Sequence, residues 1–272
     1  MTTPSFPLIL EPATLAQQLS NDALLILDLG KKDTYQQAHI PGAVHVEPKD
    51  TQLGVQPAPG KLPSKEQLTI LFSRLGLTPE KHVVVYDDEG GPWAGRMIWV
   101  LDSIGHTRYS FLNGGIHNWL AQQLPVEKTP NTPQASEYQV TDIQRNVTAT
   151  KEEILASLQD HSMCIWDARG LPEYSGEKVV GARGGHIPGA NVYEWTDALD
   201  KENGLRLRDF EHIKSELIAQ GIDGTKPIAT HCQTHRRSGL TYVIAKQLGW
   251  TVKAYDGSWA EWGSDSFLPI ES

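Results

Sequence analysis

The chain repeats itself, and this repeat constrains its fold more than any other feature. The stretch "AHIPGAVHVE" at 38–47 returns as "GHIPGANVYE" at 185–194, so that His39 corresponds to His186. Near the end of each half, "FLNGGIHNW" at 111–119 is answered by "AYDGSWAEW" at 254–262. Similarity at one long period indicates a duplicated structural unit. We therefore expect two domains that share one fold.

The boundary between the halves is marked by composition. The segment "EKTPNTPQASEYQ" at 127–139 contains Pro130 and Pro133 among small polar residues and has no apolar periodicity. Such a stretch is typical of a linker. We predict one domain over residues 1–126, a linker over 127–145 and a second domain over 146–272.

Short apolar runs alternate with helical patterns in both halves. "LLILD" at 24–28 and "HVVVY" at 82–86 have the length and composition of buried strands. In "GLTYVIAKQLG" at 239–249, the residues Leu240, Val243, Ile244 and Leu248 share one helical face before Gly249 ends the helix. This alternation predicts the α/β class, with each domain a mostly parallel central sheet flanked by helices.

Charge and cysteine content narrow the possible partners and location. A formal charge of -9 argues against nucleic acid, which requires a basic surface. The sequence contains neither a secretory signal pattern nor a run of about 20 apolar residues that could span a membrane. Its two cysteines, Cys164 and Cys232, do not suggest a disulfide framework. We expect a cytoplasmic protein that binds neither nucleic acid nor membrane.

The stretch "THCQTHRRSG" at 230–239 has the composition of an anion-binding loop. It runs from a predicted strand into the predicted helix, so Cys232 lies at the carboxyl edge of the sheet, where ligands bind in this class of fold. Backbone amides of such a loop and the positive end of the helix favour the thiolate form of a cysteine. Cys232 is therefore the candidate nucleophile.

Residues near Cys232 have competing interpretations. Arg236 or Arg237 could orient an anionic substrate, and the sequence does not decide which of them faces solvent. His235 is expected to be an exposed loop residue, and Arg183, in a glycine-rich insertion, either reaches the site as a second cation or is solvated. No metal site is expected, because four ligands at recurring spacings are missing.

The repeat also assigns roles outside the loop. Aligning Gly95 with Gly239 places Asp88 opposite Cys232, so the first domain would lack the nucleophile. Arg169 is expected to form a structural pair with Asp167. His39 and His186 precede Pro-Gly turns and are expected to satisfy backbone groups there.

Several of these motifs resemble those of a known family. "YQQAHIPGA" at 35–43 and "AYDGSWAEW" resemble the two signatures of rhodaneses, and Cys232 stands at the family's catalytic position. The chain resembles tandem rhodaneses, whose first domain is typically inactive, and within them a bacterial thiosulfate sulfurtransferase subgroup with a Cys-Gln-Thr-His loop. The resemblance implies sulfur transfer from thiosulfate to cyanide or another thiophile through a persulfide on Cys232, without a cofactor. Substrate contacts would come from Gln233, Thr234, His235, Arg236, Arg237 and Arg183.

Three alternatives stay open on the sequence alone. A 3-mercaptopyruvate sulfurtransferase would share fold and nucleophile, and a persulfide carrier would deliver sulfur to an acceptor protein. A cysteine phosphatase would have five residues between its cysteine and arginine, whereas only four separate Cys232 from Arg237. The shorter loop favours a single added sulfur atom over a phosphoryl group.

Overall fold

The computed structural model describes residues 6–272, and these form two compact units. Unit 1 comprises residues up to Thr51 together with Pro63–Gln144 and Asp200–Leu207. Unit 2 comprises Gln52–Leu62, Arg145–Leu199 and Arg208–Ser272. Each half of the chain therefore gives a short segment to the unit formed by the other half. The sequence repeat contains no sign of this exchange.

Unit 1 is built on a five-stranded sheet in the order β1-β5-β4-β2-β3, and every pairing in it is parallel. The central strands β2 and β4 are the two apolar runs identified in the sequence. The strand bounds are β1 Ile9–Leu10, β2 Leu24–Asp28, β3 Val44–His45, β4 His82–Tyr86 and β5 Tyr109–Leu112.

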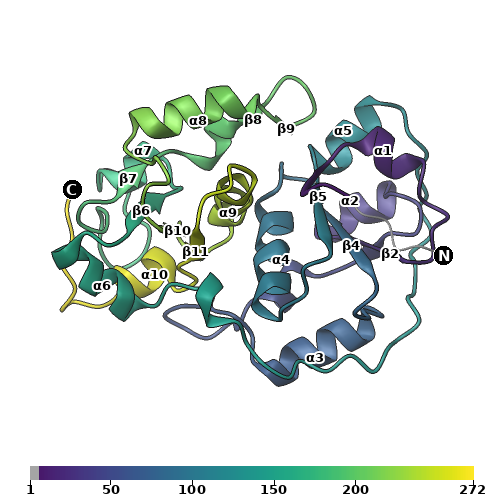
Figure 1. The fold of residues 1–272 in the computed structure, drawn as a ribbon, viewed down its shortest axis with the longest axis horizontal. Coiled ribbons are helices and arrows are strands. Elements are labelled where there is room, and N and C mark those ends of the chain that lie inside the picture. The colour runs from purple at the N-terminus through teal and green to yellow at the C-terminus, as the bar shows by residue number, and fades with distance from the viewer. Residues whose placement is uncertain (1–5) are drawn as a thin grey trace. The chain divides into compact units, whose positions relative to one another are not determined.

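Helices cover both faces of this sheet (Figure 1). On one face, Leu15 of α1 and Trp119 of α5 pack with Ile26 and Val84 of the sheet in a continuous core. Helix α4 packs against β4 and β5. The helices are α1 Pro12–Ala16, α2 Lys32–Gln37, α3 Lys65–Arg74, α4 Pro92–Ser103 and α5 Gly115–Ala121, with the 3-10 turn η1 Pro48–Thr51.

Unit 2 repeats this plan around a four-stranded parallel sheet in the order β11-β10-β6-β7. The strands are β6 Cys164–Asp167, β7 Asn191–Val192, β10 Ile228–His231 and β11 Val252–Ala254. A separate two-stranded sheet pairs β8 Leu199–Asp200 with β9 Arg206–Leu207, and all of it except Leu199 belongs to unit 1. Both units thus confirm the predicted α/β class with mostly parallel sheets.

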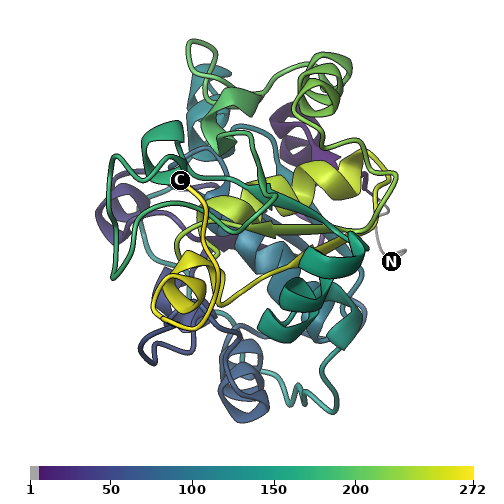
Figure 2. The same ribbon diagram turned by 90° about the vertical axis from the view of Figure 1, so that its left-hand side faces the viewer.

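Helices also pack against the sheet of unit 2. Ile154 of α6 and Trp262 of α10 pack with Ile165 and Ala229 of the sheet, whereas α9 packs against β10 and β11 (Figures 1 and 2). Leu240 is fully buried, and α9 ends before Gly249 as predicted. The elements are η2 Arg145–Val147, α6 Lys151–Asp160, α7 Leu171–Tyr174, η3 Trp195–Ala198, α8 Phe210–Ala219, α9 Arg237–Gln247 and α10 Ser258–Trp262.

The segment between the two sequence halves is ordered against unit 1. Residues 130–144 form neither helix nor strand. Hydroxyl groups fix this segment by hydrogen bonds, from Ser73 to the carbonyl of Tyr138 and from Ser136 to the carbonyl of Leu77. Within residues 6–272, no helix combines the length and apolarity needed to cross a membrane.

Candidate active site

Cys232 is the first residue after β10 and opens the loop 232–236, which leads into α9. Because β10 lies between β6 and β11, this loop begins at the carboxyl edge of the sheet centre. The predicted carboxyl-terminal motif supports it: Trp259 donates its N–H to the Cys232 carbonyl at 3.0 Å, and Ala260 donates to the Gln233 carbonyl at 2.9 Å. The motif at 254–262 therefore fixes the loop backbone.

The environment of Cys232 favours its thiolate. The side chain is 1% exposed, and this burial raises the pKa of the thiol. The guanidinium of Arg237, the hydroxyl and N–H of Ser238 and the N–H of Thr234 act in the opposite direction and outweigh burial. The pKa of Cys232 consequently lies below its ordinary value, as expected for a nucleophilic cysteine in a ring of donors.

Arg237 is the arginine whose charge acts on Cys232. It is the first residue of α9, and its two terminal nitrogens donate to the Glu173 carboxylate at 2.6 and 2.8 Å. Glu173 lies on the short helix α7 and is buried. This two-bonded contact fixes the guanidinium in one plane and lowers the pKa of Glu173 against the effect of its burial. Arg236 precedes α9 and is half-buried.

His235 does not lie where the sequence predicts. It is fully buried, with a left-handed backbone (φ 53°), and its Nδ1 lies 2.8 Å from the Ser238 hydroxyl. The expectation of an exposed loop histidine is therefore wrong. The left-handed turn directs the side chain inward, where it contacts a residue that itself faces Cys232.

The insertion at 175–184 contacts the loop through Gln233, and Arg183 takes another role. The side-chain amide of Gln233 donates to the Val180 carbonyl at 3.2 Å. The guanidinium of Arg183 donates hydrogen bonds to four backbone carbonyl groups, those of Trp262, Gly263, Asp265 and Leu268. Arg183 thus connects the insertion to the C-terminal segment, a structural role that the sequence did not predict, and its contact with the substrate stays a prediction.

In unit 1, Asp87 rather than Asp88 corresponds to Cys232. Tyr86 at the end of β4 pairs with Asp28, just as His231 at the end of β10 pairs with Asp167, so the next residues in each chain are equivalent. The Asp87 carbonyl also accepts the N–H of Ile116, as the Cys232 carbonyl accepts that of Trp259. The alignment on Gly95 was therefore wrong by one residue.

The side chain of Asp87 fills its own loop. Its two oxygens accept four backbone N–H groups at 2.8–3.0 Å, from Glu89, Gly91, Trp93 and Ala94. Glu89 lies as many residues after Asp87 as Thr234 lies after Cys232, and Trp93 likewise corresponds to Ser238. The N–H groups of Thr234 and Ser238 lower the pKa of the Cys232 thiol. Both loops are thus anion cradles, and that of unit 1 is occupied by a carboxylate of the chain itself.

A buried ionic layer lies beneath the cysteine loop. Arg169 donates to both oxygens of Asp167, as predicted, and its guanidinium stacks on Trp259 at 4.6 Å. His231 lies 3.7 Å from the same carboxylate, and burial lowers the pKa of its imidazole. The side chains of Arg169, Asp167 and His231 are almost completely buried and contact one another at the end of the strands.

The predictions that His39 and His186 satisfy backbone groups are confirmed. His39 and His186 each place Nδ1 next to a backbone carbonyl, that of Tyr35 at 2.6 Å and that of Tyr174 at 2.8 Å. Cys164 and Cys232 are both free thiols. Among residues 6–272, no three His, Cys, Asp or Glu side chains gather in a way that could hold a metal ion.

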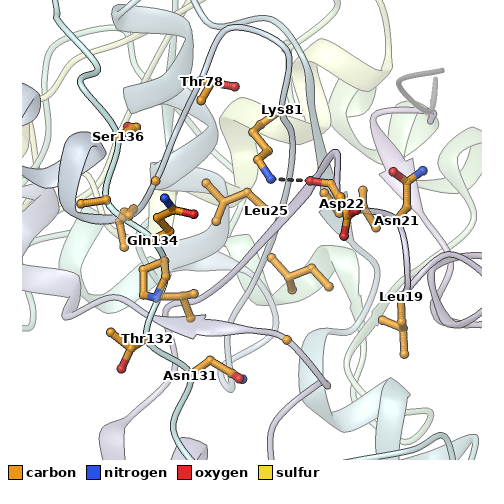
Figure 3. Close-up of a pocket in the computed structure, with 18 of the residues that line it drawn as sticks. Leu19, Asn21, Asp22, Leu25, Thr78, Lys81, Asn131, Thr132, Gln134 and Ser136 are labelled. Carbon is orange, nitrogen blue, oxygen red and sulfur yellow. Dashed lines mark hydrogen bonds between the residues drawn. The ribbon is translucent and has the colours of Figure 1, made fainter. Parts of the chain in front are cut away.

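A separate hollow of about 620 Å³ lies in unit 1, near the beginning of β2 (Figure 3). It is lined by Leu19, Leu25 and the segment 131–136, and at its rim Lys81 donates to the Asp22 carbonyl. None of the residues that line it in the described structure is a cysteine. It therefore lacks the chemistry found at Cys232.

Comparison with known proteins assigns this architecture. The rhodanese-like domain family matches residues 11–122 and again 150–265. The chain is 50% identical to a thiosulfate sulfurtransferase of Azotobacter vinelandii over 98% of both chains, and 45% identical to that of Pseudomonas aeruginosa over 97% of both. This chain belongs to the rhodanese family and contains two copies of the domain.

More distant relatives share the same fold. A 3-mercaptopyruvate sulfurtransferase of Escherichia coli is 29% identical, with coverage of 94% of this chain and 95% of that protein. An anaerobic ergothioneine biosynthesis enzyme from Chlorobium limicola superposes with a TM-score of 0.85 at 22% identity, over 99% of this chain and 71% of that one. At that identity, the second likeness concerns the fold alone.

Proposed function

We propose that this chain is a thiosulfate sulfurtransferase with Cys232 as its nucleophile. The Cys232 thiolate attacks the outer sulfur of thiosulfate, and the sulfur–sulfur bond of the donor breaks. Sulfite leaves with the electron pair of that bond, and a persulfide anion remains on Cys232. A thiophile such as cyanide then attacks the outer sulfur, which releases thiocyanate and restores the thiolate. The identity of 50% to a relative with this name supports the assignment.

The observation that carries the mechanism is the equivalence of Asp87 and Cys232. In unit 1 the cradle holds a carbon atom with two oxygens, and four N–H groups point at those oxygens. In a persulfide the Cys232 sulfur takes the place of that carbon, and the outer sulfur takes the place of one oxygen. The loop thus offers donors for one atom beyond the thiolate, which suits a persulfide better than a phosphoryl group.

Some residues around the cysteine loop would contact the substrate, and others hold the loop in position. Arg237 supplies the fixed cation, which stabilises the thiolate and the anionic persulfide alike. Gln233, Thr234 and Arg236 are half-buried and stand at the loop, where they would contact the incoming dianion. His235 supports Ser238 from inside the loop, so it acts as a positioning residue.

The proposal needs no cofactor, because the sulfur is carried on the protein. It places the reaction in the cytoplasm, where Cys232 stays reduced. The acceptor is a small thiophile in the simplest form, with a sulfur-acceptor protein as the alternative. A mercaptopyruvate preference is less well supported, since the relative with that name is 29% identical.

Intact-mass spectrometry tests the proposal directly. Protein first freed of sulfur with cyanide and then incubated with thiosulfate should gain about 32 Da, the mass of one sulfur atom on an activated cysteine. The variant Cys232→Ser, shown to be folded by circular dichroism, should gain nothing. A wild-type protein that gains no mass from thiosulfate, or gains it only from mercaptopyruvate, would refute the assignment of the donor.

A further inference from the structure

Residues 52–62, which we call the arm, come from the first half of the chain but belong to unit 2. The arm is folded on itself: Leu53 donates its N–H to the Lys61 carbonyl at 2.8 Å, and Gly54 donates to that of Pro59 at 2.9 Å. Residues 54–57 at its tip are exposed, whereas Ala58 and Gly60 are buried. The arm therefore has a solvated tip and a packed base.

The base of the arm touches the backbone of the cysteine loop. A Cβ atom added to Gly60 would lie 2.1 Å from the carbonyl oxygen of Thr234 and 3.1 Å from that of Asp256. Real Cβ atoms do not approach backbone oxygens so closely, so only glycine fits between these two carbonyl groups. The Thr234 carbonyl is the one two residues after Cys232.

Two contacts hold the arm to the motif that fixes the loop. Leu62 donates its N–H to the Asp256 carboxylate at 2.9 Å, and the Lys61 ammonium lies 2.5 Å from the Glu261 carboxylate. Asp256 and Glu261 flank Trp259, whose N–H holds the Cys232 carbonyl. The arm and the cysteine loop are therefore both bonded to the segment 256–261.

The loop that the arm contacts is strained. His235 has a left-handed backbone, a conformation that costs energy for residues other than glycine, and the equivalent position in unit 1 is Gly90. Such residues persist only where the surroundings fix them. The Ser238 hydroxyl holds the His235 side chain, and Gly60 packs against the carbonyl of the peptide that enters His235.

We infer that the arm is a positioning element for the cysteine loop and that Gly60 is the residue through which it acts. A trans peptide is planar, so the position of the Thr234 carbonyl fixes the plane that joins Thr234 to His235. Thr234 is also the residue whose own N–H points at the Cys232 sulfur. The two peptide planes on either side of Thr234 meet at its Cα atom, so a displaced carbonyl moves that Cα and with it the neighbouring N–H, which weakens the hydrogen bond to the sulfur.

The inference rests on the proposed function, but its test does not require sulfur transfer. The rate of Cys232 alkylation by iodoacetamide is measured against pH in full-length, sulfur-free protein. Gly60→Ala should raise the apparent pKa of the thiol by about one unit and slow alkylation about tenfold at pH values well below the wild-type pKa. Val55→Ala, at the exposed tip of the same arm, should match the wild type. A folded Gly60→Ala protein with the wild-type profile would overturn the inference.

A second pair of variants, at Asp256, tests the inference even if Gly60→Ala does not fold. Asp256→Ala removes the acceptor of the Leu62 N–H and should raise the thiol pKa, whereas loss of a negative charge alone would lower it. Asp256→Asn keeps an acceptor oxygen and should restore the position of the arm and fast alkylation. If Asp256→Ala lowers the pKa or leaves it unchanged, the arm does not position the loop. If the wild type gains no sulfur from thiosulfate, the proposed function is refuted, but the alkylation rates of the variants still test the role of the arm.

Discussion

The guanidinium of Arg237 meets the carboxylate of Glu173 edge to edge, through hydrogen bonds of 2.6 and 2.8 Å. This contact determines the charge balance next to the sulfur, because Arg237 lowers the pKa of the Cys232 thiol and Glu173 partly neutralises Arg237. The planar fork of arginine also holds the cation in a single orientation. The pair thus sets both the position and the strength of the positive charge.

Substitutions at the two members of this pair should have different effects on the pKa of the Cys232 thiol. Arg237→Met removes a neighbouring cation and should raise the apparent pKa of Cys232 by about one to two units, which should slow loading by thiosulfate at pH 7. Glu173→Gln leaves the cation less neutralised and should lower the pKa or leave it unchanged. Alkylation rates between pH 5 and 10 measure both. A rise of equal size in the two variants would show that Glu173 acts only by placing Arg237.

Much of this site could be predicted from the sequence, because its signals are local. The repeat, the buried apolar strands and the loop between strand and helix identify the fold and the position of Cys232. The choice between Asp87 and Asp88 required the register of the strands. Gly95 bonds to a carbonyl four residues back and Gly239 to one three residues back, so the two glycines do not occupy equivalent places.

The remaining errors concern contacts between distant parts of the chain. Arg183 finds its four carbonyl partners about 80 residues further on, and no local pattern specifies them. His235 is buried because its own backbone is left-handed, and the polar composition of the loop does not predict this conformation. The arm belongs to the unit formed by the second half of the chain, and its contacts at Gly60, Lys61 and Leu62 are with residues far away in the sequence, so no local pattern specifies them.

Asp87→Ala should cost stability but not activity. The change leaves four N–H groups of the unit 1 loop without their acceptor, and buried unsatisfied groups cost about 1–3 kcal/mol each without being additive, so we expect a loss of about 2–5 kcal/mol. Sulfur transfer per folded molecule should stay within about twofold of the wild type. Urea unfolding and turnover measured together test this expectation.

The neighbouring carboxylate provides a control for Asp87. The carboxylate of Asp88 accepts a hydrogen bond from the Thr34 hydroxyl at 2.6 Å, so Asp88→Ala should cost about 1 kcal/mol. If folded Asp87→Ala protein loses activity as completely as Cys232→Ser does, the loop of unit 1 takes part in the reaction and its assignment as inactive is wrong.

The stability of the protein should carry a pH-dependent contribution from Asp28. Burial raises the pKa of this carboxyl from 3.8 to about 7, against the hydrogen bonds from Tyr86 and Gly30. Because the folded pKa lies above the unfolded value, this contribution is complete below about pH 4 and is lost as the pH rises through 7. The shift of about three units sets an upper bound of about 4 kcal/mol.

The Asn variant isolates that contribution from other titrating groups. Asp28→Asn keeps an acceptor for the Gly30 N–H but cannot ionise. The difference in free energy of unfolding between variant and wild type should therefore grow in favour of the variant from pH 4 to pH 8. Urea unfolding at several pH values measures this difference. A difference that is independent of pH would contradict the buried, proton-binding state of Asp28.

Arg183→Ala distinguishes a structural arginine from one that binds substrate. The guanidinium holds four backbone carbonyls, and its removal leaves them without a donor, so we expect a loss of about 2–4 kcal/mol in the free energy of unfolding. The KM for thiosulfate, measured below the unfolding transition, should change less than twofold. Val179→Ala, at an exposed position of the same insertion, should alter neither quantity. A KM raised about tenfold at unchanged stability would instead place Arg183 at the substrate, because a lost cation contact to a dianion costs binding and not folding.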